Sequence, residues 1–417
     1  MISIDTLRAD HLGCYGYEAI ETPTIDGLAA AGTLFEQAYS AAPFTAPSHA
    51  SILTGAYPFS HGLRDNGSYV LAPEHLTLAE ILASRGYRTA AFISSFVLSK
   101  KFGLAQGFQT YDDDLKGGVE VDQFGRTATG GATQSRSWMG HEYDSFERSA
   151  DIANESLLPW LDAHASEPFF VWLHYYDPHL KYNPPEPFKS NYSDRLYDGE
   201  IAFVDQELGA ILRRLETLGE LDQTLVVLVA DHGESFGDRE HSHGRTLYDP
   251  LIRVPLIIVP PKFADTQPQR ISGQVRTIDI APTILDLLGL PASPTMEGET
   301  LAEQVRTGEE LATDLLAYSE THHLERPYRG GIIRSLRTPE WKYMTLEQRS
   351  LEQLYSLAAD PDERRNVLTD EPAARAEMSQ RMRETIGSDG SRPDGSGEVE
   401  MDPETIEKLR ALGYIEE

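Results

Sequence analysis

The segment Thr45-Ala-Pro-Ser-His-Ala-Ser-Ile-Leu-Thr-Gly55 leads from a turn of small residues into a short helix. Pro47 suits the first position of that helix, because the N–H that proline lacks would have no intrahelical partner there. The residues up to Leu53 can continue the helix, and Gly55 can end it in a left-handed conformation. The segment therefore predicts that Thr45 places its hydroxyl at a helix start.

A hydroxyl at a helix start has two chemical interpretations. Threonine often caps helices, so Thr45 taken alone favours an ordinary N-cap. A helix start also offers unpaired N–H groups and the positive end of the helix dipole, which together bind anions such as phosphate esters. In that second interpretation Thr45 is a nucleophile already in place. The rest of the chain decides between the two.

The length and charge of the chain limit its architecture and its partners. Its 417 residues exceed the usual size of one hydrophobic core, which predicts a large domain with an appendage. Asp and Glu number 66 against 36 Lys and Arg, and the net charge of −30 disfavours nucleic acids and anionic membranes as partners. The single cysteine, Cys14, excludes an internal disulfide and a cysteine-based metal cluster.

The beginning of the chain leaves its localisation open. No run of apolar residues approaches the roughly 20 that span a membrane, and no signal peptide is present. Met1-Ile-Ser-Ile-Asp5 nevertheless resembles the second half of a buried strand. The chain thus has the pattern of one shortened at its N-terminus, and neither an export signal nor the oligomeric state can be read from it.

Buried strands alternate with helices over the first 320 residues. The expected strands cover residues 32–39, 87–93, 168–174, 225–230 and 253–259, and the expected helices cover 23–31, 76–85, 145–165, 194–218 and 278–288. This alternation predicts an α/β fold with a doubly wound, mostly parallel sheet flanked by helices. Residues 107–140, rich in Gly, Asp and Ser, predict an irregular excursion that forms a lid or rim.

A different pattern begins near Glu320. Residues 330–337, 341–345 and 352–357 predict short antiparallel strands joined by turns, and a helix is expected over 373–386. We therefore divide the chain into three parts. These are a catalytic α/β domain (1–320), a small C-terminal subdomain with an antiparallel sheet (321–386), and a flexible linker with a short terminal helix (387–417).

Acidic and imidazole side chains follow two of the expected strands. Asp5 ends the first strand, and Asp231 and His232 directly follow the strand 225–230. In open α/β sheets, ligands bind beyond the carboxyl ends of the strands. Two carboxylates and one imidazole suit Zn²⁺, Mn²⁺, Mg²⁺ or Ca²⁺, and the residue types do not distinguish among these ions. A cation that also touched Thr45 would favour its alkoxide form.

In its motifs and their order, the chain resembles the sulfatase family of the alkaline-phosphatase superfamily. The matching segments are Ile2-Ser-Ile-Asp5, Pro47-Ser48 with Leu53-Thr-Gly55, Asp177-Pro-His179, Asp231-His-Gly233, Tyr248 with Arg253-Val-Pro255, and Leu354-Tyr355 with Asp360-Pro361 and Asn366. They cover most of the chain, and as a set they are highly specific. The resemblance implies an alkaline-phosphatase-like fold and an ester hydrolase that uses a divalent metal ion.

The resemblance also implies roles for individual residues. Asp5, Asp231 and His232 match the family's metal ligands, and Thr45 occupies the position of the nucleophile. His179 matches the histidine that contacts the transferred group or protonates the leaving oxygen. His243 lies near the position of a substrate-binding lysine, where a cationic imidazole could serve instead.

Three further residues are secondary candidates. His49 and Asn66 could hold the phosphoryl oxygens, although Asn66 in Asp65-Asn-Gly67 also fits a simple turn. Asp177 fits a brace for the loop before Pro178, and its alternative is a ligand to a second metal ion. We expect one divalent ion, with a second ion as the alternative.

The departures from the family pattern concern sulfate chemistry. Family sulfatases carry a Cys or Ser at the Thr45 position, and this residue is oxidised to the aldehyde formylglycine. Threonine cannot give that aldehyde, because its Cβ carries a methyl group. The arginine that usually follows Pro-Ser is His49, the second aspartate of the usual pair is Thr6, and no Lys-x-His motif occurs over residues 91–97.

These departures favour phosphate over sulfate. Plain Thr or Ser nucleophiles are typical of superfamily relatives that act on phosphate, including nucleotide pyrophosphatases/phosphodiesterases and phosphoglycerol transferases. Water can hydrolyse a phosphoenzyme by in-line attack, whereas a sulfate ester of ordinary threonine breaks less readily. We expect phosphodiesters or phosphonate monoesters as small anionic substrates. The alternatives are a sulfatase or promiscuous esterase without formylglycine, and a binding protein without turnover, which the retained metal set disfavours.

Overall fold

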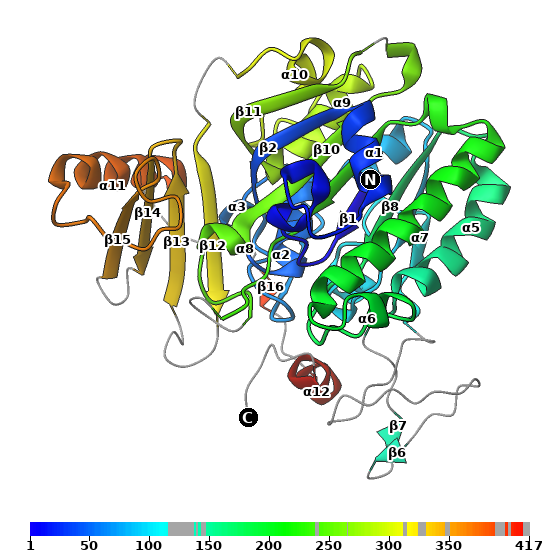
Figure 1. Ribbon diagram of the computed structural model, residues 1–417, viewed down its shortest axis with the longest axis horizontal. Helices are drawn as coiled ribbons and strands as arrows, with labels where there is room; N and C mark the ends of the chain where they lie inside the picture. Colours follow the sequence, from blue (N-terminus) through cyan, green and yellow to red (C-terminus); the bar gives the residue numbers. More distant parts are fainter. Residues whose placement is uncertain are drawn as a thin grey trace.

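The computed structural model describes residues 1–115, 137–138, 141–142, 147–237, 242–264, 266–311, 315–323, 331–346, 351–387, 397–398 and 402–411. A central sheet carries the fold, and a smaller sheet lies beside it (Figure 1). Most of the expected lid or rim, residues 116–136, and most of the expected linker, residues 388–396, lie outside the described residues.

The central sheet has eight strands in the order β11-β2-β10-β9-β1-β8-β4-β5. Their bounds are β1 (Ile2–Ile4), β2 (Thr33–Tyr39), β4 (Arg88–Phe92), β5 (Thr110–Asp112), β8 (Phe169–Tyr175), β9 (Val226–Ala230), β10 (Arg253–Val259) and β11 (Gln269–Arg276). Only β10 runs antiparallel to its neighbours, β2 and β9, among these strands. The predicted mostly parallel sheet is confirmed, with β5 and β11 as strands that were not expected.

The three innermost strands end at the same level. Ile4 of β1 is paired with Tyr175 of β8 on one side and with Ala230 of β9 on the other. All five residues of β9 are buried, as expected for a parallel strand covered on both faces. Because β1, β8 and β9 are parallel, the residues that follow them emerge together at one edge of the sheet.

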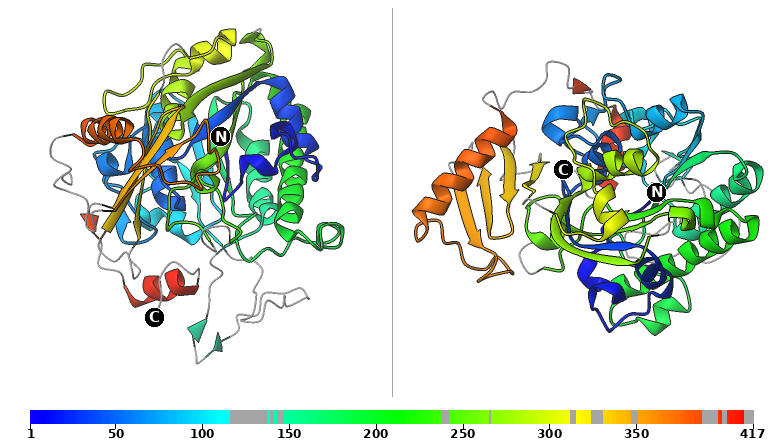
Figure 2. Two further views of the ribbon diagram at one scale, coloured as in Figure 1. Left: turned by 60° about the vertical axis from the view of Figure 1, so that its left-hand side comes forward. Right: turned by 90° about the horizontal axis from the view of Figure 1, so that it is seen from above.

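Helices cover both faces of the sheet (Figures 1 and 2). On one face α1 (Pro23–Ala31), α5 (Ala150–His164) and α7 (Leu196–Leu218) pack together, and on the other α2 (Thr45–Thr54) packs with α4 (Leu78–Ser84) and α9 (Ile280–Leu287). The remaining α-helices of the described residues are α3 (Pro58–His61), α6 (Phe188–Asn191), α8 (Asp249–Ile252), α10 (Ala302–Thr307), α11 (Pro372–Ile386) and α12 (Pro403–Ala411). Within the described ranges, none of the helices has the length and apolar character of a membrane span.

The helix α2 begins two residues earlier than the sequence predicts. Phe44 is its N-cap and Thr45 its first residue, so Pro47 occupies the third position and not the first. The prediction was wrong because the first several N–H groups of a helix all lack intrahelical partners, and proline is tolerated at any of them. Gly55 ends the helix with a φ of 64°, as expected, and all ten helical residues are buried.

The second sheet is antiparallel, as predicted, and contains four strands in chain order. They are β12 (Ala317–His323), β13 (Gly331–Arg337), β14 (Trp341–Leu346) and β15 (Leu351–Ser356), with α11 packed on β13 and β14. The first of them, β12, was not expected. Two short pairs complete the described strands, β3 (Tyr69–Val70) with β16 (Gly397–Glu398) and β6 (Ser137–Trp138) with β7 (His141–Glu142).

Buried ion pairs join the second sheet to the central domain. Lys342 of β14 is fully buried, and its Nζ lies 2.8 Å from Asp249 Oδ1 and 2.7 Å from Glu363 Oε1. Asp249 is the first residue of α8, which precedes β10 of the central sheet. Burial opposes the ionisation of Asp249, but Lys342 and Arg337 together outweigh burial and lower the pKa of that carboxyl. The ammonium group therefore neutralises two buried carboxylates from different parts of the chain.

Replacement of Lys342 by methionine should destabilise the protein strongly. Lys342→Met keeps the length of the side chain but leaves Asp249 and Glu363 without their shared cation, which typically costs about 3–5 kcal/mol. Urea denaturation measures the loss. Lys262→Met is the matched control, because Lys262 forms an exposed 2.7 Å pair with Asp222 that should contribute below about 1 kcal/mol. Equal losses in the two variants would contradict the prediction.

Candidate active site

Four side chains meet at the level edge of the central sheet. Asp5 follows β1, Asp231 and His232 follow β9, and Thr45 begins α2; all four are fully buried. Thr45 Oγ1 lies 3.5 Å from Asp5 Oδ2 and 3.4 Å from His232 Nε2. His232 Nε2 lies 3.6 Å from Asp5 Oδ1 and 3.5 Å from Asp231 Oδ2. The structure thus brings together the residues that were predicted from the sequence to be the metal ligands and the nucleophile.

The donor atoms of this group suit a cation. His232 Nδ1 lies 2.9 Å from the carbonyl oxygen of Gly233, so Nδ1 carries the hydrogen and Nε2 presents a lone pair. Asp231 Oδ1 accepts hydrogen bonds from the N–H groups of Thr6 and His232. Asp5 Oδ1 and Asp231 Oδ2 are buried and accept no hydrogen bond from any described residue. Unsatisfied carboxylate oxygens beside an imidazole lone pair fit a divalent ion.

The protonation of the group reflects its burial. Burial raises the pKa of Asp5 to about 6, and burial together with the neighbouring Asp5 raises the pKa of Asp231 to about 7. Burial also lowers the pKa of His232 to about 4, which keeps the ring neutral. The four residues of this group therefore contain no positive charge to balance their two carboxylates, and a bound cation would supply one.

The start of α2 is held by polar contacts on both sides. Ser48 donates its hydroxyl hydrogen to the carbonyl oxygen of Asp231 at 2.7 Å, which ties the helix to the end of β9. Asn66 Oδ1 accepts the N–H of Ala46 at 2.8 Å. The other amide atom, Asn66 Nδ2, is buried and has no hydrogen-bond partner within the described residues. Asn66 thus presents an unused donor beside the helix start.

Two further histidines, His179 and His243, lie next to the metal-ligand group. The ring of His243 is 4.6 Å from that of His232 and 5.0 Å from that of His179, measured between centroids. Glu234 Oε2 lies 3.2 Å from His243 Nδ1. Burial opposes the charged form of His243, but Glu234 outweighs it and raises the pKa of that imidazole. His243 is therefore the more readily protonated ring of the pair.

His179 differs from His243 in its charge. Its Nδ1 lies 2.8 Å from the carbonyl oxygen of Leu180, so the hydrogen resides on Nδ1. Burial lowers the pKa of His179 to about 3, and its Nε2 is buried without a hydrogen-bond partner among the described residues. The lone pair on Nε2 can accept a hydrogen bond from a substrate or a water molecule.

The remaining two candidates, His49 and Asp177, contact protein groups. His49 Nδ1 lies 2.7 Å from the carbonyl oxygen of Thr45, and its Nε2 lies 2.9 Å from Ser3 Oγ. Asp177 Oδ2 accepts the N–H of Ala150 at the start of α5, at 2.9 Å. Within the described residues, Asp177 does not join His179 or His243 in a group with the spacing of metal ligands.

Two residues near the site were not identified from the sequence. His174 is the penultimate residue of β8, and its Nε2 lies 3.6 Å from Asp5 Oδ2. Trp172 lies two residues earlier in the same strand and on the same face. A polar residue in such an apolar strand could have indicated from the sequence that His174 belongs to a site. Glu234 follows Asp231-His-Gly233 directly, but nothing in the sequence indicated that it would face His243.

Comparison with known proteins finds sequence similarity to one family. A sequence model of the Sulfatase family matches residues 1–290, and a model described as N-sulphoglucosamine sulphohydrolase, C-terminal, matches residues 237–388. An arylsulfatase of Clostridium perfringens is 25% identical over 440 residues, which cover 89% of this chain and 90% of that protein. An ulvan-active sulfatase of Formosa agariphila is 27% identical over 403 residues, which cover 88% of this chain and 76% of that protein.

The fold also has solved relatives outside sulfate chemistry. The crystal structure of a phosphonate monoester hydrolase of Agrobacterium radiobacter superposes with a TM-score of 0.76 at 21% identity. The superposition covers 91% of this chain and 94% of that one. Sulfatase-family enzymes depend on a metal ion, typically calcium or magnesium, and Asp5, Asp231 and His232 form a candidate ligand group for one.

Addition of a divalent ion should stabilise the protein more at high pH than at low pH. The pKa of folded Asp231 is about 7, against about 3.9 in an unfolded chain. The folded state therefore binds the extra proton over this window, and Asp231 makes the metal-free protein less stable as pH rises through it. A cation needs the deprotonated carboxylate and removes this cost at high pH.

Thermal unfolding of EDTA-treated protein, with and without MnCl₂, measures this effect at about pH 5.5 and about pH 8. The rise in melting temperature caused by Mn²⁺ should be larger at the higher pH. Asp231→Asn is the control variant, in which Mn²⁺ should cause little rise at either pH. An equal rise at both pH values, or an unchanged rise in the variant, would refute the assignment.

Proposed function

The chain belongs to the sulfatase family, and we propose that within it this protein is a metal-dependent hydrolase of phosphate esters with Thr45 as nucleophile. The family assignment confirms the expected enzyme class, an ester hydrolase. One observation carries the finer proposal. An ordinary hydroxyl, which cannot become formylglycine, lies within 3.5 Å of Asp5 and His232 at the start of a buried helix.

The proposed first step is attack by Thr45 Oγ1 on phosphorus. Asp5, Asp231, His232 and Thr45 would hold a divalent ion, which when bound neutralises substrate charge and favours the ionised hydroxyl. The hydroxyl hydrogen is directed to Asp5 Oδ2, 3.5 Å away, and we assign this carboxylate oxygen to accept the proton. The Thr45 Oγ1–phosphorus bond forms while the bond from phosphorus to the leaving oxygen breaks, which leaves a phosphothreonine.

Donors around Thr45 would hold the non-bridging oxygens of the substrate. The start of α2 contributes the positive end of its helix dipole. Asn66 is fixed through its Oδ1 and has an unused N–H₂ group, so we assign it to bind one of these oxygens. These donors are held in place before the reaction, which favours stabilisation of the charge that develops on the oxygens.

The two histidines would have different roles, His243 at the leaving oxygen and His179 at the transferred group. His243 carries the charge that Glu234 supports, so we assign it to donate a proton to the leaving oxygen or to stabilise its charge. His179 is neutral with its Nε2 lone pair available, so we assign it to the transferred group and to the water that hydrolyses the phosphothreonine. The oxygen of that water forms a bond to phosphorus as the bond from phosphorus to Thr45 Oγ1 breaks. A proton from the water restores the Thr45 hydroxyl, and the phosphorus-containing acid leaves as the product.

The proposed substrates are phosphodiesters or phosphonate monoesters. The solved relative named as a phosphonate monoester hydrolase shares the fold and supports this class. The second candidate is a sulfatase, or a mixed sulfate and phosphate esterase, that works through unmodified Thr45. The named sulfatases at 25% and 27% identity favour it, whereas threonine at the nucleophile position opposes it.

Removal of the Thr45 hydroxyl should abolish turnover. Thr45→Ala should lower kcat by about a thousandfold or more, because the covalent step is lost, while Thr45→Ser should keep activity within about tenfold. The assay uses p-nitrophenyl phosphate, bis-p-nitrophenyl phosphate, p-nitrophenyl phenylphosphonate and p-nitrophenyl sulfate with Mn²⁺, Ca²⁺ or Mg²⁺. Full activity of Thr45→Ala would remove the nucleophile assignment, and a preference for the sulfate would favour the second candidate.

A positive charge at position 243 should be sufficient for its role. His243→Ala should lower kcat by roughly a hundredfold, the usual size of a proton-transfer contribution. His243→Lys should recover a substantial part of this loss, because the ammonium group can pair with Glu234 and face the substrate. Steady-state kinetics on the best ester of the panel measures both variants. Equal activity of the alanine and lysine variants would exclude a role for the charge.

A further inference from the structure

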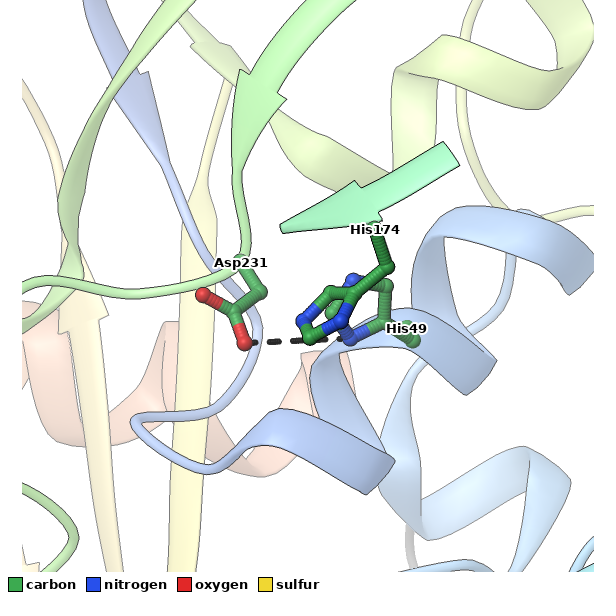
Figure 3. A group of neighbouring side chains, drawn as sticks. All are labelled: His49, His174 and Asp231. Carbon is green, nitrogen blue, oxygen red and sulfur yellow. Dashed lines mark ion pairs between the residues drawn. The ribbon is translucent and has the colours of Figure 1, made fainter. Parts of the chain in front are cut away.

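A second group of candidate metal ligands lies beside the first. Figure 3 shows His49 of α2, His174 at the end of β8 and Asp231 after β9 facing one another. All three side chains are fully buried, and His49 Nδ1 lies 3.7 Å from Asp231 Oδ2. Two imidazoles and a carboxylate have the composition of a metal site, so the positions of their hydrogens decide what they can do.

The hydrogen bonds of the two rings settle where the hydrogens lie. A carbonyl oxygen can only accept, so His49 Nδ1, at 2.7 Å from the oxygen of Thr45, must carry a hydrogen. His174 Nδ1 accepts the N–H of Ser94, which places the hydrogen of its neutral ring on Nε2. Both rings are fully buried, and burial away from water favours the neutral form of an imidazole. Each ring therefore presents an N–H, and not a lone pair, toward the carboxylates.

A chain of buried hydrogen bonds keeps His49 in this tautomer. The indole N–H of Trp172 can only donate, and it donates to Ser3 Oγ at 2.9 Å. The hydroxyl hydrogen of Ser3 is then directed to His49 Nε2, at 2.9 Å. All three side chains are fully buried, so water does not compete for these bonds. The hydrogen bonds run in one direction, from the indole through the hydroxyl and the imidazole to the Thr45 carbonyl.

We propose that His49 is a positioning residue for Thr45, held in its donor tautomer by Ser3 and Trp172. His49 follows Thr45 by four residues, so its ring lies over the first turn of α2. There it donates a hydrogen bond to the carbonyl oxygen of Thr45, the nucleophilic residue. This bond fixes the peptide plane from which the Thr45 side chain projects toward Asp5 and His232. The inference rests on the proposed function, because it takes Thr45 as the nucleophile, and it gives His49 a role other than binding substrate.

Two replacements of His49 separate positioning from packing. The amide N–H₂ of asparagine can occupy the place of Nδ1, so His49→Asn can still donate to the Thr45 carbonyl. Glutamine places its amide near Nε2 and loses that bond. We expect kcat to fall by roughly ten- to hundredfold in His49→Gln and in Ser3→Ala, with KM and bound Mn²⁺ unchanged, and by only a few fold in His49→Asn.

Ser51→Ala is the matched control for Ser3→Ala. Ser51 is also buried, and its hydroxyl contacts the ring of His61 at 2.9 Å, but this pair does not contact Thr45. Its kcat should stay within about twofold of the wild type, since no bond to the nucleophile changes. Kinetics use whichever ester of the panel the wild type hydrolyses fastest, so a preference for sulfate would refute the proposed substrate class while this comparison still tests His49.

A spectroscopic measurement tests the tautomer without reference to activity. In wild-type protein labelled with ¹⁵N-histidine, the His49 resonance, assigned by its absence from His49→Asn, should show hydrogen on Nδ1 and a bare Nε2. Ser3→Ala should convert part of this signal to the other tautomer. Hydrogen on Nε2 in the wild type would overturn the proposal, as would a His49→Asn variant no more active than His49→Gln.

Discussion

The level ends of β1, β8 and β9 are the constraint on which the site depends. Ile4 is paired with both Tyr175 and Ala230, so Asp5 and Asp231 emerge side by side at one edge of the sheet. A shift of β1 by one residue would turn Asp5 to the other face of the sheet and dismantle the ligand group. The helix α2 meets the same edge, because β2 and β9 both run antiparallel to β10 and so share one direction.

Buried carboxylates occur at two places in this protein, and the fold treats them differently. Between the two sheets, Lys342 and Arg337 surround Asp249, and the protein supplies its own cations. At the active site, no Lys or Arg among the described residues pairs with Asp5 or Asp231. His243 offsets the effect of burial on Asp5 only in part, and burial raises the pKa of both carboxyl groups. The first arrangement joins two parts of the chain. The second arrangement makes ionisation of the two buried carboxyl groups unfavourable, and a bound ion would remove this unfavourable free energy. Such an arrangement is typical of functional sites.

The sequence predicted the parts of the fold whose pattern is set locally. The run Val226–Ala230 and the long helix α7 have clear periodicity, and Asp5, Asp231, His232 and Thr45 were expected to converge because each follows a strand or begins a helix. In contrast, β11 is an edge strand in which polar and apolar residues alternate around a glycine, and this pattern alone did not predict a strand. Its extended conformation depends on its pairing with β2. A polar residue in an apolar strand marks His174 as unusual, but its partner, Asp5, lies far away in the sequence. Glu234 contacts His243, nine residues later, and no local pattern reveals that contact.

The complete burial of α2 has a consequence for how this enzyme can change over time. Every residue of the helix that bears the nucleophile contacts the packed interior, so almost any enlargement there must displace neighbours. Exchange among threonine, serine and cysteine alters only one or two heavy atoms at position 45. The chemistry of the reaction can therefore diverge through a single side chain inside an unaltered frame, while selectivity for the leaving group is free to evolve in the surrounding loops.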